Sequence, residues 1–163
     1  MIKPLQSLGT LLLFFFLALP AAAQPLIDSE SRFHPIIGAK GMVVSQEMVA
    51  SQVGASILAE GGNAIDAAVA TGFALAVTLP QAGNLGGGGF MLIYLADENR
   101  TVAIDYREMA PSAATKDMFL NAQGEVDAGK ARFSVQSSGV PGTVAGLVHV
   151  QEKYGNLSLK KVM

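Results

Sequence analysis

The chain has 163 residues, about the length of one domain. Its 11 Lys and Arg residues against 13 Asp and Glu residues give a formal net charge of −2, which argues against a surface that binds nucleic acid. The sequence contains no cysteine, which excludes disulfides, thiol catalysis and cysteine-based zinc sites.

Residues 1–23 have the pattern of a secretory signal peptide. A weakly positive start precedes the unbroken apolar run Leu11–Leu19, and Pro20–Ala23 offers a small-residue cleavage site. A membrane anchor is the alternative, but the run is shorter than the roughly 20 residues that a spanning helix needs. We therefore expect a secreted protein whose mature chain covers residues 24–163.

The first regular elements should follow an extended entry segment over residues 24–41. Met42–Ser45 is a candidate for a short strand. Over Gln46–Gly61, apolar residues recur on one helical face, and the pair Gly61–Gly62 should end this helix at a glycine C-cap.

The next helix is expected over Ala64–Leu79. Asn63 is a good N-cap, Asp66 lies in the first turn where the helix dipole favours negative charge, and Pro80 ends the helix. Because this segment is apolar almost all round, it should be buried. It is too short and too interrupted to be read as a membrane helix.

The glycine run Gly86–Gly89 lies between the apolar residues Leu85 and Phe90. Apolar flanks favour a buried turn that leads into a strand over a polar linker. No lysine follows the glycines, as a phosphate-binding P-loop requires, and the dinucleotide pattern fails because Met91 stands where its third glycine would be.

A β-hairpin should follow, with strands Phe90–Ala96 and Thr101–Tyr106 and a polar turn at Asp97–Arg100. Since Phe90–Leu95 is apolar on both faces, it predicts a central strand that is covered on both sides. Helices layered on a sheet make this an α/β (layered α+β) protein.

The rest of the chain is less regular. Lys116–Leu120 suggests one or two helical turns, residues 127–136 an irregular loop, and Ser137–Gly142 a tight glycine-rich turn. Thr143–Tyr154 predicts a helix. Leu157–Met163 begins a new element that stops in mid-pattern, which suggests a fragment of a longer product.

Arg107 is the strongest candidate for a binding residue. It follows a strand end, where side chains often point into clefts, and its guanidinium matches a carboxylate bidentately. It is suited to hold an acidic substrate, but a structural pair with Asp105 or Glu108 is equally compatible with the spacing.

No catalytic nucleophile is evident. The G-x-S-x-G elbow is missing, and nothing in the spacing of His34 and His149 supports a triad or a metal site. The predicted mature chain begins with Gln24, which is not an N-terminal nucleophile. The residues by themselves thus indicate a secreted α/β domain without catalytic machinery, metal or cofactor.

Four blocks of the sequence follow one another in a specific order, namely Gly61–Ala70, Pro80–Met91, Asp105–Pro111 and Val140–Gly146. Together they resemble the start of the large subunit of the γ-glutamyltranspeptidase (glutathione hydrolase) family. The resemblance runs from about residue 34 to the end of the chain, and four blocks in order are far more specific than any one motif.

The resemblance implies an N-terminal nucleophile hydrolase, an αββα sandwich that this chain covers only in part. It implies a secreted precursor, periplasmic in Gram-negative bacteria, that cuts itself into a large and a small subunit that remain together. The threonine freed at the start of the small subunit would attack the γ-glutamyl amide of glutathione. The glutamyl group would then pass to water, an amino acid or a peptide, without a metal or cofactor.

Arg107 matches the family's arginine that binds the α-carboxylate of the γ-glutamyl group. The catalytic threonine would lie beyond Met163, so this fragment holds no catalytic residue and should be inactive alone. A related cephalosporin acylase, a poly-γ-glutamate-processing enzyme, a non-catalytic periplasmic module that binds acidic amino acids, and a degenerate gene fragment remain as alternatives.

Overall fold

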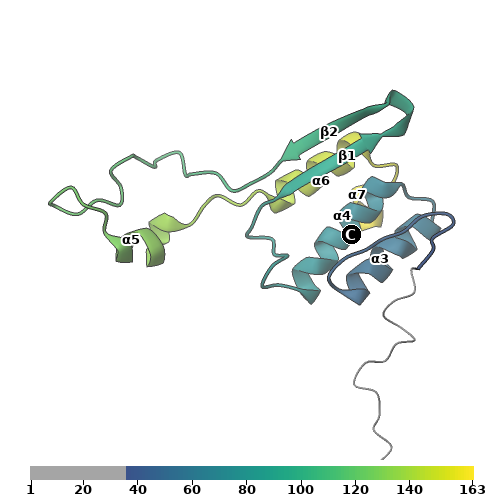
Figure 1. The fold of residues 1–163 in the computed structure, drawn as a ribbon, viewed down its shortest axis with the longest axis horizontal. Coiled ribbons are helices and arrows are strands. Elements are labelled where there is room, and N and C mark those ends of the chain that lie inside the picture. Colours follow the sequence, from purple (N-terminus) through teal and green to yellow (C-terminus); the bar gives the residue numbers. More distant parts are fainter. Residues whose placement is uncertain (1–35) are drawn as a thin grey trace, which may run out of the picture. The chain divides into compact units, whose positions relative to one another are not determined.

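The computed structural model describes residues 36–163, so the predicted signal peptide at residues 1–23 and His34 lie outside the described residues. The chain divides into two units, the second of which covers Gly38–Met163. All elements of Figure 1 belong to this second unit, which is described here by itself.

Helix α3 spans Met48–Ala59 and ends in the predicted glycine pair. Gly61 has a φ of 91°, a left-handed conformation that glycine adopts without steric cost. The Gly62 amide donates to the Ile57 carbonyl (2.9 Å) and the Gly61 amide to the Leu58 carbonyl (3.1 Å). These two bonds form a Schellman motif, which confirms the predicted helix end.

Helix α4 spans Ala64–Thr78 and begins with a complete capping box. The Asn63 side chain accepts from the Asp66 backbone amide (3.0 Å), and the Asp66 carboxylate accepts from the Asn63 amide (2.7 Å). Most of the first half of α4 is buried, but Ala64 and Ala68 are exposed, the second half is only half-buried, and Val77 is exposed. The prediction of burial all round is therefore wrong, because the described residues do not surround α4 on every side.

The hairpin forms as predicted, with slightly different bounds. Strands β1 (Phe90–Leu95) and β2 (Arg100–Asp105) pair antiparallel and are joined by the short 3₁₀ helix η1 (Ala96–Glu98). These two strands are the whole sheet within residues 36–163.

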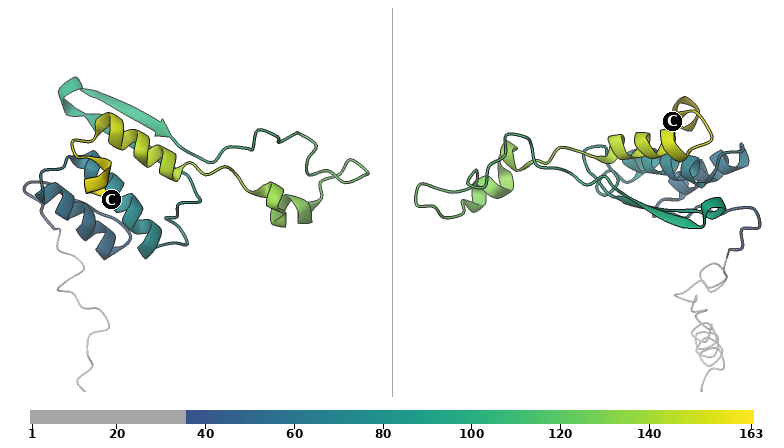
Figure 2. Two further views of the ribbon diagram at one scale, coloured as in Figure 1. Left: turned by 180° about the vertical axis from the view of Figure 1, so that it is seen from behind. Right: turned by 90° about the horizontal axis from the view of Figure 1, so that it is seen from above.

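One face of the hairpin is bare, which corrects the prediction of a strand covered on both sides. Met91, Ile93 and Leu95 turn toward the helices, while Phe90 and Leu92 lie on the opposite, exposed face. Figure 2 shows the helices along one side of the hairpin only. The sequence is apolar on both faces, but the described residues cover only one of them.

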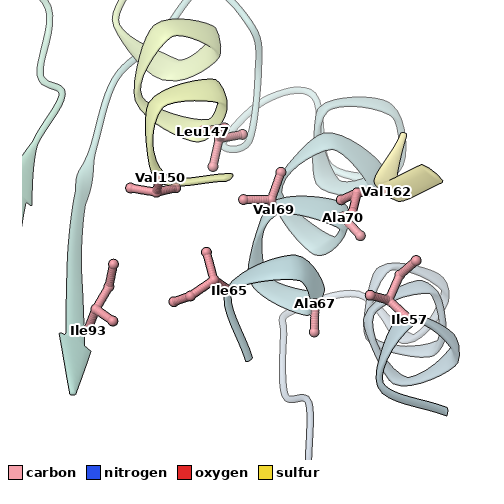
Figure 3. Packing of buried hydrophobic residues seen from close by; sticks show 9 residues of the cluster. All are labelled: Ile57, Ile65, Ala67, Val69, Ala70, Ile93, Leu147, Val150 and Val162. Carbon is pink, nitrogen blue, oxygen red and sulfur yellow. The ribbon is translucent and has the colours of Figure 1, made fainter. Parts of the chain in front are cut away.

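The core lies between α3, α4, the inner face of β1 and the last two helices, α6 (Thr143–Tyr154) and α7 (Leu159–Val162). Figure 3 shows the buried apolar side chains that fill it. They are Ile57, Ile65, Ala67, Val69, Ala70, Ile93, Leu147, Val150 and Val162. Small residues on α4 allow its close approach to α3 and α6.

A buried carboxylate links the start of α4 to the end of α6. Asp66 is fully buried and accepts hydrogen bonds from the Gln151 side chain (2.5 Å) and from the Asn156 and Leu157 backbone amides (3.1 Å each). The Asn63 side chain reaches the Tyr154 carbonyl (2.7 Å) from the same turn. The capping residues thus also join parts of the chain that are far apart in sequence.

Several local predictions are wrong. Met42–Ser45 forms no strand, because the described residues offer it no partner strand. The predicted loop at 127–136 contains helix α5 (Ala128–Phe133), which the Asp127 side chain caps at the Lys130 amide, and the start of the 3₁₀ helix η2 (Val135–Ser137).

Turns replace the suggested helix at residues 116–120. In place of a tight turn at Ser137–Gly142, the end of η2 leads into a bridge between Val140 and Met109. The predicted helix at Thr143–Tyr154 is confirmed as α6, with Gly155 as its C-cap, and the new element at Leu157–Met163 contains α7.

Candidate functional site

Arg107 lies two residues beyond the end of β2, where the chain leaves the hairpin. Its guanidinium carbon is 5.8 Å from the centroid of the Phe90 ring, and its Nε is 3.4 Å from a carboxylate oxygen of Glu108. The Arg107 backbone amide donates to the Asp105 side chain (2.9 Å). The Arg107 side chain is 63% exposed, so the long Glu108 contact contributes little to stability.

Tyr106 anchors this segment on the opposite, helix-facing side. Its backbone exchanges hydrogen bonds with Gly89, and its ring packs against Gly146 of α6, where any side chain would collide with it. Burial raises the pKa of the Tyr106 hydroxyl. With Tyr106 held inward, the alternation of side chains turns Arg107 toward the bare face.

The glycine run packs against the start of α6. The Gly87 carbonyl accepts from the Gly142 amide (2.9 Å) and the Thr143 amide (3.0 Å). A Cβ at Gly88 would lie 2.8 Å from the Arg107 Cα. The run leads into β1 as predicted, but it is only half-buried and its apolar flanks Leu85 and Phe90 are exposed, which corrects the prediction of a buried turn. Glycine is needed at position 88 because the Arg107 backbone passes so close.

A hollow of about 630 Å³ opens beside Arg107, between the end of β2 and α6. Its walls are mostly apolar, a common setting for a small-molecule site with a few placed polar groups. The lining residues with polar side chains are Asp105, Tyr106, Arg107, Ser112 and His149. Arg107 and Asp105 are the charged residues among them, and the Arg107 guanidinium itself lies against Phe90 on the bare face. An exposed guanidinium of this kind is suited to a small anionic ligand such as a carboxylate.

The structure brings the predicted residue Arg107 together with both suggested structural partners, Asp105 and Glu108. His149 lines the same hollow. Within residues 36–163, no group of three or more His, Asp or Glu side chains could hold a metal ion. No helix in this part of the chain is long and apolar enough to cross a membrane.

Two features of the structure were not predicted from the sequence. Phe90 lies against the guanidinium, and Asp66 connects α4 to α6. The first could have been found by pairing the predicted strands, since Phe90 is directly opposite Asp105 in the hairpin. No sequence signal indicates the second, because Gln151 is 85 positions away.

Comparison with known proteins gives consistent results. The family model described as gamma-glutamyltranspeptidase matches residues 50–163. The glutathione hydrolase proenzyme of Escherichia coli is 59% identical over 134 residues, which are 82% of this chain and 23% of that protein. The Acylase ACY 1 proenzyme of a Pseudomonas species is 38% identical over 152 residues, 88% of this chain and 27% of that protein.

The fold agrees with these matches. A crystal structure of Helicobacter pylori gamma-glutamyltranspeptidase superposes with a TM-score of 0.74 at 50% identity, over 78% of this chain and 37% of that chain. This likeness confirms the predicted fold class. The chain spans less than a quarter of the Escherichia coli protein's length and just over a quarter of the acylase's.

Proposed function

Because this chain belongs to the γ-glutamyltranspeptidase family, we propose that it forms the N-terminal part of the large subunit of a γ-glutamyltransferase that also hydrolyses glutathione. Residues 1–23 are a signal peptide that directs the precursor out of the cytoplasm, to the periplasm in a Gram-negative cell. Residues 24–163 belong to the large subunit, which stays with the small subunit cut from the same precursor.

One observation carries the proposal: an exposed guanidinium lies at the end of β2, on the bare face of the sheet and beside the hollow. We assign to Arg107 the role of binding the α-carboxylate of the γ-glutamyl group. A guanidinium binds a carboxylate through two parallel hydrogen bonds, which fixes the orientation of the substrate as well as its position.

The chemistry itself needs the small subunit. Its N-terminal threonine hydroxyl adds to the γ-carbonyl and its own amine takes the proton. The amide C–N bond breaks and the leaving amine takes up a proton, which leaves a glutamyl ester on the threonine. Water, an amino acid or a peptide then attacks the ester and restores the threonine. Arg107 binds the substrate in both steps and transfers no proton.

The test is to sequence the DNA downstream of codon 163, express the complete precursor and measure γ-glutamyl-p-nitroanilide cleavage. We expect self-cleavage into two subunits and transfer to glycylglycine. Arg107→Ala should raise KM about 10- to 100-fold, as expected for losing charged hydrogen bonds of 1.5–3 kcal/mol. Arg100→Ala is a matched control, since Arg100 is an exposed arginine of the same hairpin, paired with Glu98.

A reading frame that ends without a small subunit would overturn the proposal, as would a processed enzyme that ignores γ-glutamyl donors. A related acylase is the second candidate, because the acylase proenzyme matches 88% of this chain. Preference for a cephalosporin or a glutaryl amide over the γ-glutamyl donor would favour it. Glutamate binding by the chain alone, lost in Arg107→Ala, would favour a non-catalytic binding module.

A further inference from the structure

Phe90 and Arg107 share the bare face of the hairpin. Phe90 is directly opposite Asp105, and Gly89 continues the pairing with Tyr106 through two backbone hydrogen bonds. Side chains alternate along paired strands, so Asp105 and Arg107 lie on the Phe90 side while Tyr106 turns toward the helices. The register thus brings the ring beneath the guanidinium, at 5.8 Å from the centroid to Cζ.

The contact leaves the binding edge of the guanidinium available. Within residues 36–163, the guanidinium of Arg107 makes one hydrogen bond, the long one from Nε to Glu108 (3.4 Å), so its two terminal nitrogens donate none. An aromatic ring attracts a cation held over it and takes up none of the hydrogen-bond donors of that cation. A carboxylate can therefore approach the terminal nitrogens of Arg107 while Phe90 holds the cation in place.

Within residues 36–163, burial of the ring does not account for Phe90. Its side chain is 65% exposed, comparable to Tyr94 at 64% on the same face, whereas Ile93 of the same strand is 4% exposed. Any β-forming apolar residue would satisfy the strand at such a position. An aromatic ring at position 90 differs from these residues in presenting a π face to a cation.

We propose that Phe90 is a positioning residue that orients Arg107 for the α-carboxylate of the γ-glutamyl donor. This inference rests on the proposed function of Arg107. Asp105 supports the same geometry from the backbone, since it accepts the Arg107 amide hydrogen bond. Phe90 acts through Arg107 and makes no contact with the reacting atoms.

The test measures KM and kcat in the complete processed enzyme. Phe90→Leu keeps apolar bulk and removes the ring, and should raise KM for γ-glutamyl-p-nitroanilide about three- to tenfold with kcat nearly unchanged. Phe90→Tyr should restore KM. Tyr94→Leu is the control, an aromatic residue exchanged on the same face that makes no cation–π contact among the described residues, and should leave KM unchanged although it also removes a hydrogen bond to Asn99.

Two further comparisons separate positioning from general damage. In an Arg107→Ala background, Phe90→Leu should have no further effect on KM. The donor 4-aminobutanoyl-p-nitroanilide lacks only the α-carboxylate. With this donor, Phe90→Leu and the wild type should have the same KM. The inference would be overturned if Arg107→Ala raised KM for the γ-glutamyl donor and Phe90→Leu did not. It would also be overturned if Phe90→Leu raised KM equally for both donors.

Failure of the proposed function has a different signature, namely a wild-type enzyme without γ-glutamyl activity. In that case the NMR signals of the Arg107 δ-protons test whether the Phe90 ring lies against the Arg107 side chain. Phe90→Leu should shift these signals downfield by removing the ring current, and Tyr94→Leu should not. Signals that do not move in Phe90→Leu would overturn the inference by themselves.

Discussion

The carboxylate of Asp66 accepts a hydrogen bond from the side-chain amide of Gln151, which lies 85 positions further along the chain. Both side chains are buried, with exposed fractions of 0% and 2%. The backbone amides of Asn156 and Leu157, just beyond α6, also donate to Asp66, and no cation is paired with it among the described residues. The negative charge is therefore stabilised by hydrogen bonds and by its place in the first turn of α4, without an ion pair.

Asp66→Asn should lower the free energy of unfolding by about 2–4 kcal/mol. The amide group places a donor where Asp66 faces only donors, so buried hydrogen bonds are lost and desolvated groups remain unpaired. Urea unfolding of the complete protein measures the change. Glu152→Gln, a carboxylate exchanged on the exposed side of α6, is the control, and equal loss in both variants would contradict the prediction.

The same carboxylate predicts a dependence of stability on pH. Burial raises the pKa of Asp66, but hydrogen bonds from the Gln151 side chain and from the Asn63, Leu157 and Asn156 amides lower it below the usual 3.8 overall. The stabilisation is complete above the unfolded-state pKa and is lost as pH falls through the folded-state pKa. The wild type and Asp66→Asn should therefore differ less in free energy of unfolding below about pH 4. A difference that stays constant down to about pH 2 would contradict this prediction.

Gly146→Ala should disturb the segment that carries Arg107. The added methyl collides with the Tyr106 ring, and overpacking of this kind costs about 1–3 kcal/mol. Gly72→Ala is the matched control, because its methyl meets only the flexible Leu147 side chain at 3.1 Å and helix propensity favours alanine. Thermal unfolding should separate the two variants, and a larger loss in Gly72→Ala would refute the role of the Tyr106 contact.

Gly61→Ala should cost about 1 kcal/mol through backbone conformation alone. Gly61 has a φ of 91°, and no atom lies near the position of an added Cβ, so strain is the expected cause. Gly61→Asn should be tolerated better, since asparagine enters left-handed conformations more readily. Chemical denaturation midpoints test the order glycine, asparagine, alanine.

Leu92→Asp tests whether a further layer covers the bare face of the hairpin. Leu92 is 76% exposed, so the charge should not destabilise the chain described here. In the complete precursor the proposed second sheet would bury it, and folding and self-cleavage should fail because an unpaired charge is costly to bury. Normal self-cleavage of the variant precursor would show that this face stays open.

The local signals in the sequence determined much of this protein. The N-cap Asn63, the glycine pair after α3, the hairpin with its polar turn and the helix before Gly155 were all predicted, because each depends on residues within a few positions of one another. Helix α5 was missed although Asp127 is a good cap, because its short apolar pattern is too weak to show a period.

The tertiary structure decided the rest. The placement of Phe90 beneath Arg107 follows from strand register, and the Asp66–Gln151 bond follows from how α6 returns to α4. Likewise, an apolar pattern shows which faces can be buried, whereas burial itself requires a neighbour, and Leu92 has none among the described residues. Contacts between distant segments depend on how the helices and strands pack together. Local patterns of residue type and spacing do not determine that packing.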